Sequence, residues 1–191
     1  MPTQSTIETH YPAGPLGGAV SLSFGCAMLA AVVADPLHLA IGSAAGGVLA
    51  LLDLVLLRRY LLAGRRPTPR QRRIFILTVL SLTLCMSVAS PLLARLDLRT
   101  EWLAKLAITA VHLLAMRFCH GPLMGRLGGI CLGIAAAGAM LPDLPIAGVV
   151  AIDAAAKIVF GSLLVFAGRL PDAQVPATII PSIRRVGEST P

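Results

Sequence analysis

The stretch that decides the fold is the run RRYLLAGRRPTPRQRR at residues 58–73, which separates two long apolar segments. Two prolines, Pro67 and Pro69, interrupt any helix that would pass through it. In membrane proteins, loops rich in Lys and Arg remain on the cytoplasmic side. The run therefore predicts a cytoplasmic loop between two transmembrane helices. Its basic residues are Arg58, Arg59, Arg65, Arg66, Arg70, Arg72 and Arg73.

The composition agrees with a membrane protein. The chain has 191 residues, of which 56% are hydrophobic and 13% are charged, whereas soluble domains are about 25% charged. The net charge of +7 would suggest nucleic-acid binding in a soluble protein. Here the arginines cluster at the ends of apolar segments, so membrane topology explains them and we expect no nucleic-acid binding. Fourteen arginines against two lysines, with abundant alanine, are typical of a GC-rich bacterial genome and predict the bacterial inner membrane.

Six apolar segments follow one another along the chain. Most reach the length of about 17–25 residues that a hydrocarbon layer of ~30 Å requires. They cover residues 16–34, 37–57, 74–94, 102–118, 127–141 and 145–168. The fifth would form a helix of only about 22 Å. It either begins earlier, through residues 121–126, or lies in a thinned bilayer, or is re-entrant.

We therefore expect an all-α fold, a polytopic membrane helix bundle of about six transmembrane helices. Residues 1–15 and 169–191 are expected to be flexible segments on either side of the transmembrane domain, residues 16–168. With the loop at 58–73 inside, Arg117 and Arg126 also fall inside, as does the C-terminal tail. Twelve arginines then lie on the cytoplasmic side and two on the outer side, which predicts that both termini are cytoplasmic.

Small residues four positions apart allow helices to approach closely in lipid. Such pairs occur at Gly42–Gly46 and Gly129–Gly133, and we expect them to pack within the bundle. The four cysteines form no CxxC motif, and Cys119–His120 lacks further ligands at a usual spacing. We therefore expect neither a metal site nor a cofactor.

Ionisable residues within membrane spans are costly and need a partner or a function. At 1.5 Å per residue, His112, Asp153 and Lys157 lie about 15, 12 and 18 Å from the outer ends of their segments. Thr83 and Ser87, with Ser90, share one face of the third segment. We hypothesise a polar cavity lined by the third, fourth and sixth segments, with these residues on a proton or solute pathway. The alternative is a structural Asp153–Lys157 pair and a histidine that only packs between helices.

Two other charged residues have simpler explanations. Asp53 lies about 6 Å from the inner end of its segment, where it is expected to pair with the arginine loop. Lys105 follows Glu101 by four residues, which favours a structural ion pair.

The sequence contains no GxSxG, HExxH or P-loop motif, so we expect no enzyme activity. A small-solute or ion/proton-coupled transporter, or a membrane subunit of one, fits six spans with charges near the midplane. The alternative is an accessory or assembly subunit that docks through its arginine loop, onto anionic lipid headgroups or an acidic partner. Six helices often need further copies to surround a pathway, so a homo-oligomer or larger complex is expected.

Overall fold

The computed structural model describes residues 11, 13–34, 38–57 and 67–167, and every regular element in these ranges is a helix. The helices are α1 (Gly14–Ala34), α2 (Leu39–Leu52) with its continuation η2 (Asp53–Leu57), α4 (Pro69–Leu93), α5 (Leu98–His120), α6 (Pro122–Met140) and α7 (Ile146–Ala167). Counting α2 and η2 together, six helices in the described ranges are long and apolar enough to cross a membrane. The all-α, six-helix prediction is confirmed, and this is the architecture of a multi-pass membrane protein.

The fifth span is longer than the apolar pattern alone indicated. α6 begins at Pro122 and has 19 residues, a length of about 28 Å. Gly121 adopts φ 96° between α5 and α6, a conformation that glycine adopts without strain. Proline is favoured at the first helical position because it has no N–H to leave unbonded. Of the three alternatives, the earlier start is therefore correct, and Arg126 lies inside α6.

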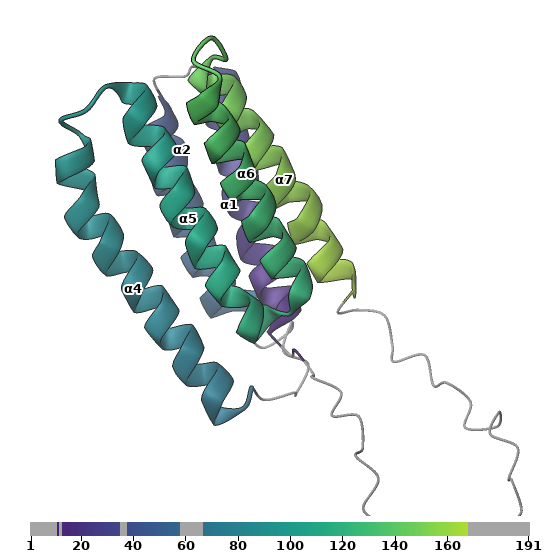
Figure 1. The fold of residues 1–191 in the computed structure, drawn as a ribbon. Helices are drawn as coiled ribbons and strands as arrows, with labels where there is room; N and C mark the ends of the chain where they lie inside the picture. Colours follow the sequence, from purple (N-terminus) through teal and green to yellow (C-terminus); the bar gives the residue numbers. More distant parts are fainter. Residues whose placement is uncertain (1–10, 12, 35–37, 58–66, 168–191) are drawn as a thin grey trace, which may run out of the picture.

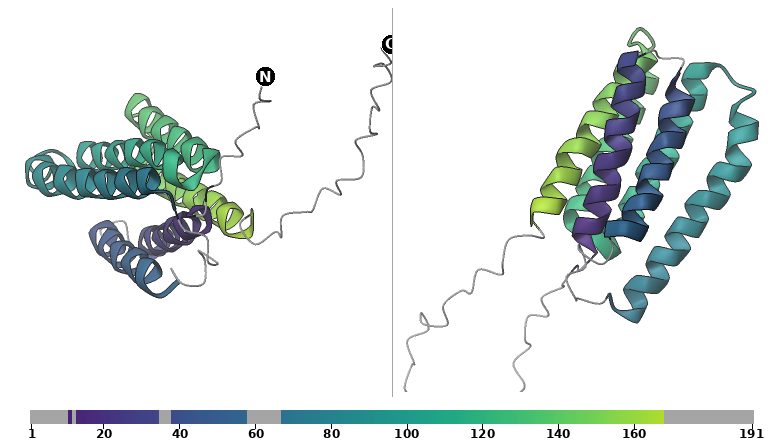
Figure 2. Two further views of the ribbon diagram at one scale, coloured as in Figure 1. Left: turned by 90° about the horizontal axis from the view of Figure 1, so that it is seen from below. Right: turned by 180° about the vertical axis from the view of Figure 1, so that it is seen from behind.

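The helices form two layers. Seen from one end (Figure 2, left), α4, α5 and α6 make one layer, while α2, α1 and α7 make the other. The most extensive contacts are α1 with α7 and α5 with α6, and a smaller contact between α6 and α7 joins the layers. The side view shows α4 at the edge of the bundle beside α5 (Figure 1).

Glycines bring α1 and α7 into backbone contact. A Cβ added at Gly18 would lie 2.7 Å from the carbonyl oxygen of Gly161, and one at Gly25 would lie 2.8 Å from that of Ala154. These pairings show that the helices run antiparallel, so α1 begins where α7 ends. The same end carries the start of α4 and the end of α5, where the Cys119 thiol donates to the carbonyl oxygen of Gln71 at 3.2 Å. We call it the arginine-rich end.

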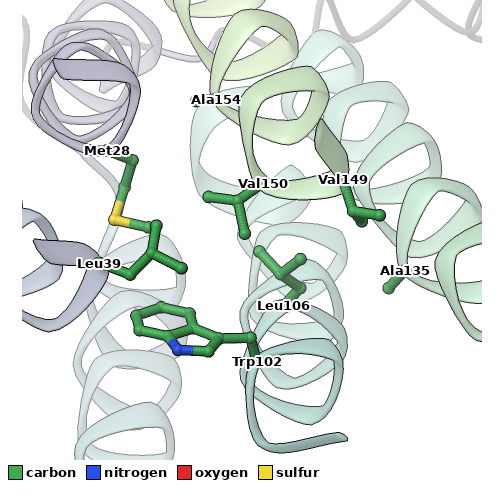
Figure 3. Packing of buried hydrophobic residues seen from close by; sticks show 8 residues of the cluster. All are labelled: Met28, Leu39, Trp102, Leu106, Ala135, Val149, Val150 and Ala154. Atoms are coloured by element: carbon green, nitrogen blue, oxygen red, sulfur yellow. The ribbon is translucent and has the colours of Figure 1, made fainter. Parts of the chain in front are cut away.

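Apolar side chains fill the other half of the bundle between five helices. Figure 3 shows how α1, α2, α5, α6 and α7 meet around Met28, Leu39, Trp102, Leu106, Ala135, Val149, Val150 and Ala154. A second cluster lies nearer the arginine-rich end, where α5, α6 and α7 contribute Ala110, Leu113, Met116, Met124, Leu127, Cys131 and Leu164.

α4 differs from the other helices because none of its residues is buried. Its start is well defined: the Thr68 hydroxyl accepts from the Gln71 amide at 3.2 Å, and the Gln71 side chain accepts from the Thr68 amide at 3.0 Å. This reciprocal capping satisfies two amides of the first turn. Large apolar residues such as Leu77 and Leu84 are 64% and 66% exposed. Such a surface needs lipid or another helix against it rather than water.

The two predicted glycine pairs have different outcomes. Gly42 and Gly46 pack on α1, where an added Cβ would come within 2.4 Å of Ala31 and 2.8 Å of Phe24 respectively. That prediction is confirmed. The prediction for Gly129–Gly133 is wrong, because nothing within the described part of the chain lies within 4 Å of either position. It is the neighbouring Gly128 that faces α5.

Candidate functional site

A buried ion pair occupies the middle of α7. The Lys157 ammonium donates to Oδ2 of Asp153 one helical turn away, and each side chain is only 3% exposed. At 1.5 Å per residue, the two positions lie about 10 and 16 Å along a helix of about 33 Å. The predicted pairing of these residues is therefore found in the structure.

The pair lies where the two apolar clusters meet. Ala154 belongs to the first cluster, and Ala156 packs against the second. On α6, the thiol of Cys131 is close enough to interact with both charged side chains. The pair therefore faces the contact between α6 and α7, which is less extensive than the contact between α1 and α7.

One atom of the pair has no partner. Asp153 Oδ1 is buried and accepts no hydrogen bond from any described residue. Removing two charges from water costs several kcal/mol per ion, and their attraction offsets this only when the remaining polar atoms are also satisfied. An apolar pair of similar size would often be at least as stable. Stability alone therefore does not explain this site.

His112 lies elsewhere. Its Nδ1 is 3.2 Å from the carbonyl oxygen of Thr78 on α4, and this contact ties α4 to α5. The histidine borders a cavity of about 470 Å³ whose lining residues all belong to α4 and α5. Neither Asp153 nor Lys157 is among them. The structure thus brings Asp153 and Lys157 together but does not place His112 with them.

Thr83 and Ser87 also lie away from the pair. Both are exposed on α4, and the Thr83 hydroxyl donates to the carbonyl oxygen of Val79 at 3.0 Å within the same helix. Ser90 is half-buried. The Thr83 and Ser87 hydroxyls lie on the outward face of α4, so the hypothesised cavity between the third, fourth and sixth spans is not assembled in this conformation.

The arginine run is only partly described. Arg58, Arg59, Arg65 and Arg66 lie outside the described residues, as do residues 1–10 and 12 and the whole C-terminal segment. The N-terminal segment expected to be flexible ends earlier than predicted, because α1 already begins at Gly14. Arg70, Arg72 and Arg73 are exposed in the first turns of α4. Asp53 begins η2, and its buried Oδ2 has no hydrogen-bond partner among the described residues. The expected pairing of Asp53 with the arginine loop therefore remains a prediction.

The Glu101–Lys105 pair is found as predicted, with each side chain 19% exposed. The Lys105 ammonium also lies 4.9 Å from the centre of the Trp102 ring. This pair stands near the start of α5, at the end of the bundle opposite the arginine-rich end. It offers a natural comparison for the buried pair.

Two structural residues were missed by sequence reasoning. His120, which lies just beyond the fourth predicted segment, is buried: its Nδ1 donates to the carbonyl oxygen of Ala13 at 2.6 Å, and its ring contacts Phe75 edge-on with the ring centres 5.9 Å apart. It borders a cavity of about 320 Å³ between α1, η2, α4 and α5. The available signal was Gly17, whose missing side chain leaves room for the imidazole.

The other missed residue is Arg99 in the first turn of α5. Its guanidinium donates to the carbonyl oxygens of Leu144 and Leu141 at 2.5 and 2.6 Å, and to that of Gly138. It thereby caps the end of α6 and fixes the turn into α7. No sequence pattern identifies this long-range contact.

Comparison with known proteins gives a family but no function. In the described ranges, no three His, Cys, Asp or Glu side chains lie close enough to share a metal ion. No curated protein and no solved structure matches the chain. The model of one family matches residues 18–174, which include all of α2 to α7 and most of α1. The chain belongs to that family, DUF6609, a family of unknown function.

Proposed function

We propose that this protein is a non-catalytic membrane transporter that moves a small anionic solute together with a proton, with Asp153 and Lys157 as its binding site. The observation that supports the proposal is the buried pair with its unpartnered carboxylate oxygen, Asp153 Oδ1. Ionisable groups at this depth in membrane proteins usually mark proton or substrate pathways.

The charges of the pair suggest a coupling mechanism. When Asp153 binds one proton, its carboxylate becomes a neutral carboxylic acid, and Lys157 loses its counter-ion. A monovalent anion then takes the place of the carboxylate beside the ammonium. The empty pair and the loaded pair both have no net charge, so neither form carries an uncompensated charge through the membrane. Release of the anion and the proton on the other side restores the ion pair.

Access to the pair requires the helices to move. Glycine contacts hold α1 against α7, and Gly128 packs against the backbone of α5 at Ala110, where an added Cβ would lie 3.0 Å from the carbonyl oxygen. The smaller α6–α7 contact joins these two helix pairs. Rocking of one pair against the other would open the contact at which the ion pair lies. Relative motion of rigid helix groups around a central site is a common transport mechanism.

Reconstitution in sealed liposomes tests the proposal. Liposomes loaded with a pH-sensitive dye are exposed to inward gradients of small inorganic and carboxylate anions. We expect anion-dependent acidification with the natural protein and none with Asp153→Asn/Lys157→Met. The matched control is Glu101→Gln/Lys105→Met, which removes a similar i,i+4 pair outside the bundle centre. Full activity of the Asp153/Lys157 double variant, or no anion-dependent proton uptake by the natural protein, would contradict the proposal.

A second function is favoured by a different observation. α4 buries none of its residues and exposes hydroxyl groups at Thr83 and Ser87. A helix of this kind suits contact with another membrane protein, which would make the chain an accessory or assembly subunit. Crosslinking in membranes followed by mass spectrometry tests this role. We expect a reproducible crosslinked partner that is lost when Thr83 and Ser87 are replaced by leucine. If the leucine variant crosslinks to the same partners as the natural protein, the accessory role is contradicted.

A further inference from the structure

A second candidate site lies at the arginine-rich end, on the side of the bundle formed by α5 and α6. The last turns of α5 and the first turns of α6 enclose a groove of about 500 Å³. Its lining residues are Tyr11, Leu114, Arg117, Phe118, Pro122, Gly125 and Arg126. This groove shares no residue with the Asp153–Lys157 site, so the inference is independent of the proposed transport function.

Gly125 shapes the groove. A Cβ at this position would lie 3.1 Å from Cβ and 3.4 Å from Cδ of Arg117, so the arginine stem crosses α6 directly over the glycine. The guanidinium carbon of Arg117 lies 4.7 Å from the centre of the Phe118 ring. Cation–π contact of this kind favours a defined guanidinium position over free movement in solvent. Arg117 is therefore partly preorganised at the groove.

The charges in the groove have one sign. Both Arg117 and Arg126 line it, and none of the described acidic residues does. Neither arginine forms an ion pair with a described carboxylate. Two unpaired guanidinium groups beside one groove repel each other, and an anion between them would turn this repulsion into two attractions. Guanidinium groups bind phosphate oxygens especially well because their N–H groups form a fork.

The apolar part of the lining shows which phosphate fits. Leu114 lies one helical turn deeper along α5 than Phe118, and Phe118 is 52% exposed on the outer surface of the bundle. The groove thus joins a basic end, at the level expected for headgroups, to an apolar wall at the level of the acyl chains. Basic pockets between helices at this level of a membrane bind anionic lipid headgroups. A soluble phosphate compound would gain nothing from the apolar wall.

We infer that the α5–α6 groove is a binding site for an anionic phospholipid, whose phosphate lies between Arg117 and Arg126 and whose acyl chain lies along Leu114 and Phe118. General attraction of arginines to headgroups would be insensitive to the shape of the groove. A built site loses its lipid when the groove is filled, even if all charges are kept. This difference makes the inference testable.

Fluorescence quenching by brominated lipid provides a local measurement. Val111, 56% exposed and seven residues before Phe118, is replaced by tryptophan in all samples, which puts the reporter about 10 Å deeper along α5. The protein is reconstituted in mixtures of phosphatidylglycerol and phosphatidylcholine, with one or the other dibrominated in the middle of its chains. The natural Trp102, measured alone in the parent protein, supplies the background signal.

Charge and shape are then varied separately. Arg117→Gln/Arg126→Gln removes the charges, and Gly125→Leu fills the groove. The matched controls are Arg95→Gln, an exposed arginine beyond the other end of the bundle, and Gly129→Leu, one turn further along α6 where nothing lies within 4 Å. We expect the reporter protein and both controls to prefer phosphatidylglycerol by roughly tenfold, since each basic residue near a membrane surface contributes modestly. Both groove variants should show a preference near one.

Three results would overturn the inference. One is equal quenching by the two brominated lipids in the reporter protein. Another is an unchanged preference for phosphatidylglycerol in Gly125→Leu, which would mean that general electrostatic attraction, and not the shape of the groove, holds the lipid. The third is displacement of brominated phosphatidylglycerol by millimolar glycerol phosphate, which would identify a site for soluble phosphates instead of lipid.

Discussion

Neutralising Asp153 or Lys157 alone should destabilise the protein far more than neutralising both. Each side chain is 3% exposed, so a charge left without its partner cannot be solvated by water. Removing one member of a buried pair typically costs about 3–5 kcal/mol. Asp153→Asn/Lys157→Met leaves no charge and keeps similar volumes, so we expect a cost of about 0–2 kcal/mol. The double-mutant cycle should therefore give a coupling energy of several kcal/mol.

Thermal unfolding with a thiol-reactive dye can measure these differences in detergent. Cys119 and Cys131 are buried and become reactive on unfolding, whereas Cys26 and Cys85 are exposed. Replacing the exposed pair by serine leaves only the signal from unfolding. A shift of about 2–4 °C per kcal/mol is expected at this chain length. Glu101→Gln, which breaks the more exposed pair on α5, should cost at most about 1 kcal/mol.

An additive result would refute the reasoning. If each single substitution cost less than 1 kcal/mol and the double variant equalled their sum, the two charges would be individually solvated. The pair would then not be buried between α6 and α7 in the resting protein. The proposed mechanism, in which an anion replaces the Asp153 carboxylate beside Lys157, begins from a buried ion pair and would then have no basis.

Three further predictions concern positions away from the pair. Arg99→Met should lower the free energy of unfolding by roughly 2–4 kcal/mol because three backbone carbonyls lose a charged donor. Arg95→Met removes an exposed arginine at the same end and should change it by less than about 0.5 kcal/mol. Melting curves with the thiol-reactive dye compare the two variants. Gly161→Ala should lower the free energy of unfolding by about 1–3 kcal/mol, because the added Cβ would collide with the backbone of α1. Gly129→Ala should leave it unchanged or raise it. Equal melting temperatures of the two variants would contradict the α1–α7 contact. Hydrogen bonds from Thr100 hold the pKa of the Asp97 carboxyl below its ordinary value of 3.8. The stabilising effect of the ionised carboxylate is therefore present above pH 3.8 and is lost as the pH falls through the lowered pKa. Asp97→Asn keeps the helix cap and should remove this acid dependence in melting curves recorded from pH 7 to pH 3.

The sequence was most informative where water and lipid meet. The arginine run and the apolar lengths predicted six helices, because charges at helix ends obey a strong physical rule. Asp153 and Lys157 were found together because their spacing of four fixes them on one helix face. The start of α6 was left open because Gly121 and Pro122 are compatible with either a loop or a helix start.

Helix rotation could not be predicted in the same way. In a membrane, lipid-facing and buried positions are both apolar, so the hydrophobic pattern does not show which face packs inward. Gly129 and Gly133 therefore looked like a packing pair, although Gly128 makes the contact. For the same reason His112 was placed in one cavity with Asp153, because depth is readable from residue counting but direction is not.

The identity of the buried cation bears on which function is correct. The chain uses arginine at fourteen of its sixteen basic positions, yet the cation at the centre of the bundle is Lys157. For a purely structural bridge arginine is the better residue, because its planar fork can bond both oxygens of a carboxylate and its charge is less strongly hydrated. The lysine here reaches Oδ2, and Oδ1 of Asp153 has no hydrogen-bond partner among the described residues. That free oxygen is the atom at which a proton can be taken up without first breaking the ion pair. A site built for proton exchange needs such an atom, whereas a site built for stability would satisfy it.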